Sequence, residues 1–168
     1  MVKVIDNCVS KNKQNLIIEY VLTNKFFPWF LLNDITFDKN TKQRRPAFGH
    51  LFIQDKKQNS SIAKFIVSIL SKYTNKDVIK CRSLLQLPLG SRQKYDTPHI
   101  DLPTPHTVYL YYVVDSDGET VLFKNSKIIK KIKPKKGRLL IFDGALLHTA
   151  YQPKSSIRCV INFDVEKE

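Results

Sequence analysis

The strongest constraint on the fold is a series of short segments, rich in β-branched and aromatic residues, that begins at Val78. The segments are VIKCRSLLQL, TVYLYYVV, ETVLF, KIIKKI, GRLLIFDG and IRCVINFDV, and several of them are separated by the turn sequences DSDG, KNS, KPKKG and QPKSS. Short strands joined by tight turns are typical of antiparallel sandwiches and barrels. We therefore predict an antiparallel sandwich or barrel over residues 78–168.

The first 77 residues carry the helical signals. Ser10 is a candidate N-cap for a helix over residues 10–24, in which Leu16, Ile17, Tyr20 and Val21 have helical spacing. A second helix is predicted over residues 60–75, with an apolar stripe formed by Ile62, Phe65, Ile66, Ile69 and Leu70. The segment between them mixes apolar runs with turn residues and indicates strands and loops. We expect one α+β domain over residues 1–168, with 1–77 as a mainly helical support and 78–168 as the barrel core.

The chain of 168 residues is long enough for one sizeable core. It has no run of eighteen apolar residues, and MVKVIDNCVS lacks the apolar region of a secretory signal. Three scattered cysteines, Cys8, Cys81 and Cys159, show no metal-ligand spacing and suit a reducing compartment. We expect no membrane partner and a cytoplasmic location.

The net charge of +13 is the one extreme of the composition. Such a charge favours acidic partners, either nucleic acid or an acidic protein surface. Eight basic residues fall between Lys124 and Arg138, where the isoleucines of a strand would face one way and the lysines mostly the other. This stretch is either a binding surface or a solvated hairpin face, and the sequence leaves both open.

The segment PHIDLPTPHTVYLYYVV, residues 98–114, contains a histidine and an aspartate two positions apart. On a strand, residues i and i+2 point to the same side, so His99 and Asp101 present an imidazole and a carboxylate to one point. The pair alone is better explained as a hydrogen-bonded surface couple than as a metal site.

A second segment, GRLLIFDGALLHTAYQPKSSIRCVINF, adds His148 and, ten residues later, Arg158. Two histidines and one carboxylate form the facial triad of non-haem iron(II) oxygenases, which leaves positions open for other ligands. Arg158 is placed among residues that otherwise look buried, and a buried guanidinium needs an anionic ligand or an acidic neighbour. Its planar fork suits a carboxylate.

The order HID, DGETVLF, PKKGRLLIFDGALLHTAYQP and SSIR resembles the iron(II)- and 2-oxoglutarate-dependent oxygenases of the prolyl 4-hydroxylase type, including small members from phages and bacteria. The resemblance implies a double-stranded β-helix, or jelly-roll barrel, with N-terminal supporting helices. It further implies that His99, Asp101 and His148 bind Fe(II) and that Arg158 binds the distal carboxylate of 2-oxoglutarate. Some prolyl hydroxylases carry lysine at the position of Arg158, so this residue does not decide the substrate.

The same resemblance suggests that the hydroxyl of Tyr112 reaches the carboxylate bound by Arg158. A shift of register by one residue would exchange Tyr112 with Tyr111 and Tyr109 on the other face, and core packing explains all three equally well. Thr120 and Asn162 are further candidates for lining the 2-oxoglutarate pocket, Asn162 because it has the strand parity of Arg158.

The remaining candidates have simpler interpretations. His50 and His106 are expected to be structural or exposed. Trp29 and the neighbouring phenylalanines Phe26, Phe27 and Phe30 are expected in the core rather than as a platform for stacking bases. Arg44, Arg45 and Arg82 are available for substrate contact or for solvation alone.

The function implied by the resemblance is hydroxylation of a C–H bond, with dioxygen and 2-oxoglutarate consumed and ascorbate as an optional reductant. A peptidyl proline or another protein side chain is the favoured substrate. Two alternatives stay open, because fold does not fix function. One is an oxidative nucleic-acid demethylase, which the net charge favours, and the other is a non-catalytic jelly-roll module that binds acidic partners.

Overall fold

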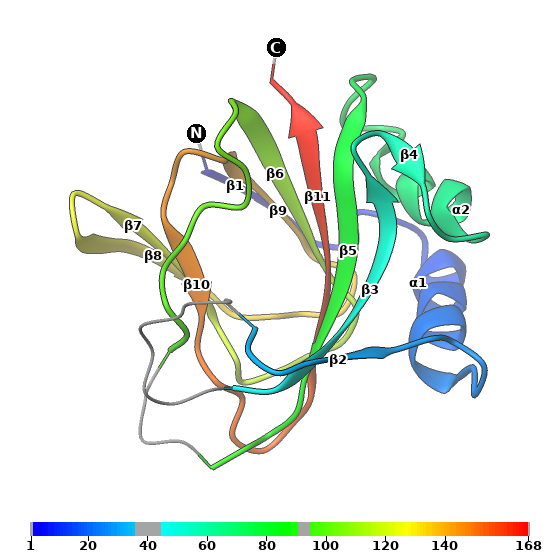
Figure 1. The fold of residues 1–168 in the computed structure, drawn as a ribbon, viewed down its shortest axis with the longest axis horizontal. Coiled ribbons are helices and arrows are strands. Elements are labelled where there is room, and N and C mark those ends of the chain that lie inside the picture. Colours follow the sequence, from blue (N-terminus) through cyan, green and yellow to red (C-terminus); the bar gives the residue numbers. More distant parts are fainter. Residues whose placement is uncertain (1, 36–44, 91–94, 168) are drawn as a thin grey trace.

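A computed structural model describes residues 2–35, 45–90 and 95–167 (Figure 1). The helical elements are α1 (Lys11–Ile18), a π-helical turn (Glu19–Thr23), α2 (Ala63–Val67) and a 3-10 turn (Ser68–Leu70). The strands are β1 (Val2–Ile5), β2 (Phe30–Leu32), β3 (Ala47–Gln54), β4 (Lys57–Gln58), β5 (Val78–Gln86), β6 (His106–Tyr112), β7 (Thr120–Lys124), β8 (Lys127–Ile132), β9 (Leu139–Asp143), β10 (His148–Ala150) and β11 (Arg158–Glu166). The six predicted strand segments after residue 77 therefore all form strands.

The strands form two antiparallel sheets. The large sheet has the order β1-β9-β6-β11-β5-β3-β2, with β4 also paired to β3, and the small sheet has the order β10-β7-β8. Leu122 of β7 and Ile132 of β8 pack in one cluster with Val108, Leu140 and Phe142 of the large sheet. The small sheet therefore covers the inner face of the large one, and the fold is the predicted double-stranded β-helix.

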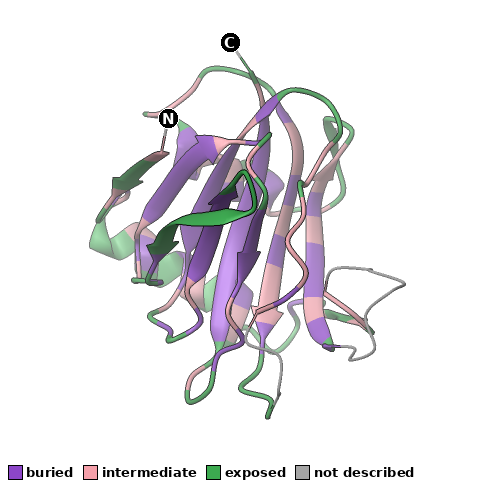
Figure 2. Cartoon of the chain, turned by 90° about the vertical axis from the view of Figure 1, so that its left-hand side faces the viewer, coloured by how far each residue is buried: buried purple, intermediate pink, exposed green. Residues whose placement is uncertain are grey.

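Alternation along the strands divides the core into two parts. On β6, Tyr112 points into the cluster between the two sheets. Tyr109 and Tyr111 point to the other face of the sheet, where they share a core with Ile17 and Ile66 of the helices. Buried residues run along the central strands (Figure 2). This register settles which of the three tyrosines faces the barrel interior.

The N-terminal helices cover the outer face of the large sheet. The hydroxyl of Ser10 accepts a hydrogen bond from the backbone nitrogen of Lys13 at 3.3 Å, as predicted for the N-cap. Ile17 and Val21 are fully buried, whereas the predicted stripe residues Leu16 and Tyr20 are exposed. No helix in the described ranges is long and apolar enough to cross a membrane.

The second helix is shorter than its predicted range. α2 ends at Val67 and continues as the 3-10 turn, in which the Ser68 hydroxyl donates to the carbonyl of Phe65 at 2.5 Å. A serine hydroxyl that bonds the local backbone competes with the helical pattern. Ile66, Ile69 and Leu70 are nevertheless buried as expected.

The prediction that residues 1–77 form a mainly helical support is wrong in part. Strand β1 pairs with β9, and β3 pairs with β5 over Phe48 to Ile53, so both belong to the large sheet. The pattern of β3 is weak because Gly49 and His50 interrupt its apolar residues. Without β3, the edge of β5 would be left unpaired beside the pocket.

Two further expectations are corrected. Ile128 and Ile129 of β8 point to opposite faces, as consecutive strand residues do, and both are exposed at the edge of the small sheet, whereas Ile132 is buried. Phe26 and Phe30 are also exposed. Trp29 does pack against the core, and its indole nitrogen donates to the carbonyl of Val21 at 3.0 Å.

Candidate metal centre

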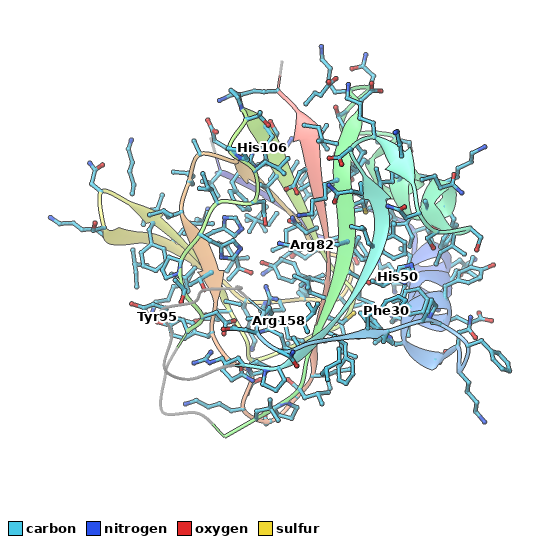
Figure 3. All side chains as sticks on the ribbon, in the orientation of Figure 1. Phe30, His50, Arg82, Tyr95, His106 and Arg158 are labelled. Atoms are coloured by element: carbon cyan, nitrogen blue, oxygen red, sulfur yellow. The ribbon has the colours of Figure 1, made fainter. Side chains whose placement is uncertain are left out.

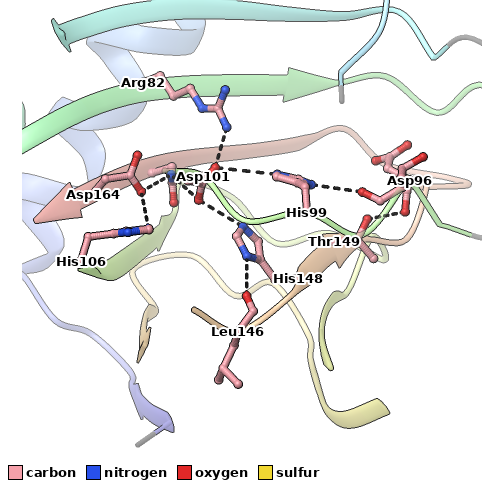
Figure 4. A network of polar contacts seen from close by, with 11 residues as sticks. Arg82, Asp96, His99, Asp101, His106, Leu146, His148, Thr149 and Asp164 are labelled. Atoms are coloured by element: carbon pink, nitrogen blue, oxygen red, sulfur yellow. Dashed lines mark hydrogen bonds and ion pairs between the residues drawn. The ribbon is translucent and has the colours of Figure 1, made fainter. Parts of the chain in front are cut away.

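His99, Asp101 and His148 meet at one end of the cavity between the two sheets (Figure 4). The backbones of His99 and His148 exchange two hydrogen bonds of 3.0 Å, which aligns the two histidines although His99 lies outside the named strands. Asp101 Oδ1 lies 3.7 Å from His99 Nε2, and Asp101 Oδ2 lies 3.1 Å from His148 Nε2. One ligand atom from each residue lies within 4.8 Å of the others, so the three predicted ligands are brought together.

Both histidine rings are oriented by the backbone. His99 Nδ1 lies 3.1 Å from the carbonyl oxygen of Thr97, and His148 Nδ1 lies 3.2 Å from that of Leu146. A carbonyl only accepts, so each Nδ1 carries the proton and each Nε2 lone pair is left for a metal. Two neutral imidazoles and a carboxylate suit Fe(II) in a facial arrangement, so the residues fit the predicted metal.

Both oxygens of the Asp101 carboxylate are held by neighbouring side chains. Arg82 Nη2 donates to Oδ1 at 2.8 Å, and Asn162 Nδ2 donates to Oδ2 at 3.1 Å. Burial alone would raise the pKa of Asp101, but the neighbouring imidazoles of His148 and His99 and the charge of Arg82 hold it well below its usual range. The carboxylate is thus charged at neutral pH, as a metal ligand must be.

Arg158 lies deeper in the same cavity and is 4% exposed. Its Nε, Nη1 and Nη2 each donate a hydrogen bond of 2.9 Å, to the carbonyl of Gly118, to Gln86 Oε1 and to Thr120 Oγ1. These acceptors are all neutral, and no carboxylate of the described ranges pairs with Arg158 at ion-pair distance. A guanidinium has five N–H donors, so two remain for an anionic ligand.

Tyr112 reaches Arg158 through Thr120. The tyrosine hydroxyl donates to Thr120 Oγ1 at 2.7 Å, and Thr120 is fully buried in the wall of the cavity. Burial raises the pKa of Tyr112 to about 12, so its hydroxyl keeps its proton and stays a donor. The predicted residues Arg158, Tyr112 and Thr120 therefore form one network.

The cavity connects the Arg158 network to the three candidate ligands. Its lining consists of Ile35, Arg82, Leu84, Gln86, Asp96, His99, Asp101, Leu110, Thr120, His148, Thr149, Ala150, Arg158, Val160 and Asn162. Asn162 lines it as predicted, but its amide contacts Asp101 and Asp164 rather than Arg158.

Four polar residues of this lining were not predicted as site residues or were left undecided, namely Arg82, Gln86, Asp96 and Thr149. Arg82 and Gln86 lie four residues apart on one face of β5, and this spacing in an otherwise apolar strand was the available signal. Asp96 accepts hydrogen bonds from Arg45 Nη1 at 2.9 Å and from Gln86 Nε2 at 3.0 Å. Nothing in the sequence pairs Arg45 with Asp96, since 51 residues separate them.

The other two histidines, His50 and His106, are both buried, and His106 forms a second potential metal-binding group with Asp101 and Asp164. His50 packs among aromatic rings, and its Nδ1 lies 2.9 Å from the carbonyl oxygen of Pro28. His106 is buried beside Asp164, with 3.8 Å between His106 Nε2 and Asp164 Oδ1. Burial and the nearby charge of Asp101 raise the pKa of Asp164 to about 7. Arg44 lies outside the described residues.

Comparison with known proteins identifies the fold. No protein-family model and no curated protein matches the sequence. Among solved structures, a 2OG-Fe(II) oxygenase family oxidoreductase from Burkholderia pseudomallei matches with a TM-score of 0.76 and 11% identity over 97% of this chain and 84% of its own. The viral collagen prolyl hydroxylase of Paramecium Bursaria Chlorella virus-1 matches with a TM-score of 0.61 and 17% identity over 98% and 94%.

A prolyl hydroxylase from Trichoplax adhaerens, solved with a peptide fragment of the hypoxia inducible factor oxygen degradation domain, matches with a TM-score of 0.67 and 17% identity over 98% and 83%. All three likenesses extend along nearly the whole chain. The chain therefore has the fold of the 2-oxoglutarate- and Fe(II)-dependent oxygenases, as the resemblance of its motifs implied. Identities of this size establish the fold and leave the activity to the site itself.

Proposed function

We propose that this protein is an Fe(II)- and 2-oxoglutarate-dependent dioxygenase that hydroxylates a C–H bond of a peptide or protein side chain. The observation that carries the proposal is the presence, in one cavity, of two oriented histidines, a charged carboxylate and a buried arginine with donors to spare. Each part has another explanation when taken alone. Together they meet the needs of a metal and of a dicarboxylate.

In this proposal His99, Asp101 and His148 hold the metal. Bound there, Fe(II) supplies the oxidising chemistry, in which 2-oxoglutarate and dioxygen yield succinate, carbon dioxide and one oxygen atom inserted into the substrate C–H bond. The protein keeps both imidazoles in the Nδ1–H tautomer through the carbonyls of Thr97 and Leu146. Arg82 and Asn162 keep the carboxylate in place.

Arg158 binds the distal carboxylate of 2-oxoglutarate. Its three hydrogen bonds to neutral acceptors fix the plane of the guanidinium, so the two remaining N–H groups are preorganised for a carboxylate fork. Thr120 Oγ1 accepts hydrogen bonds from both Arg158 Nη2 and the Tyr112 hydroxyl, so it links the arginine to the tyrosine. The arginine and the threonine of this network thus stand on strands β11 and β7.

A peptidyl proline is our first choice of substrate. Two of the matching structures described above are prolyl hydroxylases, and one of them holds a peptide fragment. The alternative of a nucleic-acid demethylase rests only on net charge and receives no support from these matches.

The test is turnover of 2-oxoglutarate. The protein is loaded with Fe(II) anaerobically, mixed with 2-oxoglutarate, ascorbate and air, and presented with proline-containing peptides, methylated oligonucleotides and free amino acids. We expect succinate in step with a gain of one oxygen atom on a peptide, both abolished by His148→Ala. A non-catalytic module would give no succinate above that variant, and loss of methyl from the oligonucleotide alone would indicate the demethylase.

We retain a cytoplasmic location as part of the proposal. All three cysteines are buried and free, which suits a reducing compartment. Detection of the chain in a fractionated cell is the direct test.

A further inference from the structure

The inner face of the large sheet continues past the metal centre toward the edge strand β2. Across β11, β5 and β3, the residues Asn162, Arg82 and Leu51 are paired in register. In the next row, Leu84 pairs with Gly49, and Gly49 pairs with Phe30 of β2. Paired residues share a face of the sheet. The surface that holds Asp101 through Asn162 and Arg82 therefore extends over β3 and β2.

This extension forms an apolar groove, lined on its floor by Phe30, Leu32, Gly49, Leu51 and Leu84. A Cβ at Gly49 would lie 3.0 Å from Leu32 Cδ1, so the glycine lets Leu32 lie flat over the strand. Phe30 is 62% exposed in the described structure. The exposed ring continues the apolar floor of the groove, and contiguous exposed apolar surface is typical of a docking surface.

Arg82 forms the boundary between the groove and the metal cavity, since it lines both. Only its Nη2 has a hydrogen bond, to Asp101, and its buried Nε has no partner in the described ranges. Lys80, two residues away on the same face of β5, also lines the groove and forms no ion pair within those ranges. In the projection of Figure 3, Arg82 lies between His106 and the residues Phe30 and His50.

The two cations make the groove selective by charge. Within the described ranges Arg82 forms an ion pair with Asp101 alone, and a metal bound by Asp101 would share that negative charge. Burial and the positive charge of Arg82 lower the pKa of Lys80, and the negative charges of Asp164, Asp101 and Asp55 offset this only in part. An incoming carboxylate would satisfy both side chains at the end of an apolar floor.

We propose that this groove, from Phe30 to Arg82, binds an extended acidic segment of the peptide substrate, with an apolar side chain on Phe30 and Leu51 and a carboxylate at Arg82 and Lys80. The proposal rests on the proposed function and specifies its substrate class. The net charge of +13 draws such a segment to the protein, but the two groove cations select it.

The experiment measures binding, with full-length protein loaded anaerobically with Fe(II) and 2-oxoglutarate. Three fluorescein-labelled octapeptides share one proline and two leucines and carry two glutamates, two glutamines or two lysines. We expect the glutamate peptide to bind about tenfold more tightly than the glutamine peptide, as one new charged contact predicts, and the lysine peptide to bind weakest.

Variants separate the groove from the overall charge. Lys80→Gln removes one groove cation, and Lys127→Gln removes the same charge from exposed strand β8. We expect Lys80→Gln to reduce the preference for glutamate several-fold and Lys127→Gln to leave it unchanged. Arg82→Gln should also reduce it, with iron content measured in parallel because Arg82 contacts Asp101. Phe30→Ala should weaken all three peptides alike.

The outcomes are distinct. Equal affinity for the three peptides, or an equal loss from Lys80→Gln and Lys127→Gln, would overturn the proposal. The proposal would also be overturned if an oligonucleotide displaced the glutamate peptide from wild type and did not bind to Lys80→Gln. The groove would then be a site for nucleic acid. Succinate formation without a charge preference would refute this inference alone, whereas a charge preference without any succinate formation would refute the proposed function.

Discussion

Gly118 and Arg158 lie so close together that a side chain on Gly118 would displace the arginine. The Gly118 carbonyl accepts the Nε–H of Arg158 at 2.9 Å. A Cβ on Gly118 would lie 2.9 Å from Arg158 Cδ and also 2.9 Å from the backbone oxygen of Tyr151. The oxygen of Tyr151 belongs to the backbone, so it cannot move aside by a side-chain rotation. The glycine of the DSDG turn thus sets the position of the guanidinium.

We therefore expect Gly118→Ala to disturb both folding and the binding of 2-oxoglutarate. Overpacking of this kind typically costs roughly 1–3 kcal/mol of unfolding free energy. Urea unfolding measures that cost, and calorimetric titration measures the affinity for 2-oxoglutarate. Gly90→Ala is the matched control, because a Cβ there meets nothing within 4 Å. Equal stability of the two variants would show that the site yields freely around Gly118.

Arg158→Ala should weaken 2-oxoglutarate binding by roughly 2–5 kcal/mol, the range for removing one partner of a buried charge pair. The substitution removes the N–H donors that would bind the ligand. It also removes the hydrogen bonds that Arg158 donates to Gln86 and Thr120. Arg158→Lys should lose less, because it keeps a charge but not the fork. Iron content should stay near the wild-type value in both variants, and an affinity within error of wild type would contradict the assignment.

Single alanine substitutions at His99, Asp101 and His148 should each lower the iron content after anaerobic loading. The reason is geometric, since each contributes one of the donor atoms that lie within 4.8 Å of one another. In wild type, metal at a hundredfold excess over its Kd should raise the unfolding free energy by about 2.7 kcal/mol. Elemental analysis and thermal unfolding check the two results. Unchanged stoichiometry in all three variants would refute the metal centre.

The barrel was predictable because its strands are local in sequence and strongly patterned. The segments after Val78 have β-branched and aromatic residues bounded by turn residues, and each became a strand. Strand β3 was harder to assign, because Gly49 and His50 break its alternation. Its place in the sheet depends on pairing with β5, whose residues follow their β3 partners by 28 to 37 positions. The prediction that the isoleucines of β8 face one way failed for a different reason. This strand is exposed on both faces over its first five residues.

The candidate ligands were predictable from spacing and family resemblance, whereas their supports were not. His99, Asp101, His148 and Arg158 stand in recognisable segments. The residues that hold them come from distant positions, as when Arg82 reaches Asp101. The sequence alone does not show which face of the sheet Tyr112 occupies. That depends on the register between β6 and β11, in which Tyr112 pairs with Val160.

Asp6 and Arg138 form an ion pair whose contribution to the stability of the fold should be lost in acid. Arg138 Nε and Nη2 donate to the two Asp6 oxygens at 2.7 and 3.1 Å, and the hydrogen bond from Arg138 lowers the pKa of Asp6 to about 2. Because the folded pKa lies below the unfolded value of about 3.9, the stabilisation is fully present above the unfolded pKa. It is lost as the pH falls through the folded one.

A double-mutant cycle of Asp6→Asn and Arg138→Gln isolates this pair from the other carboxylates that titrate in the same range. Asp6 is 39% exposed at its side chain, so solvent screens the pair and the coupling energy at neutral pH should not exceed about 1 kcal/mol. It should fall as the pH approaches about 2 and vanish below that value, where the carboxyl group is protonated in the folded state as well. Urea unfolding of the four proteins at neutral and acidic pH gives both values. A coupling energy that is the same at both would mean that the contact is not an ion pair, because a neutral hydrogen bond does not depend on ionisation of Asp6.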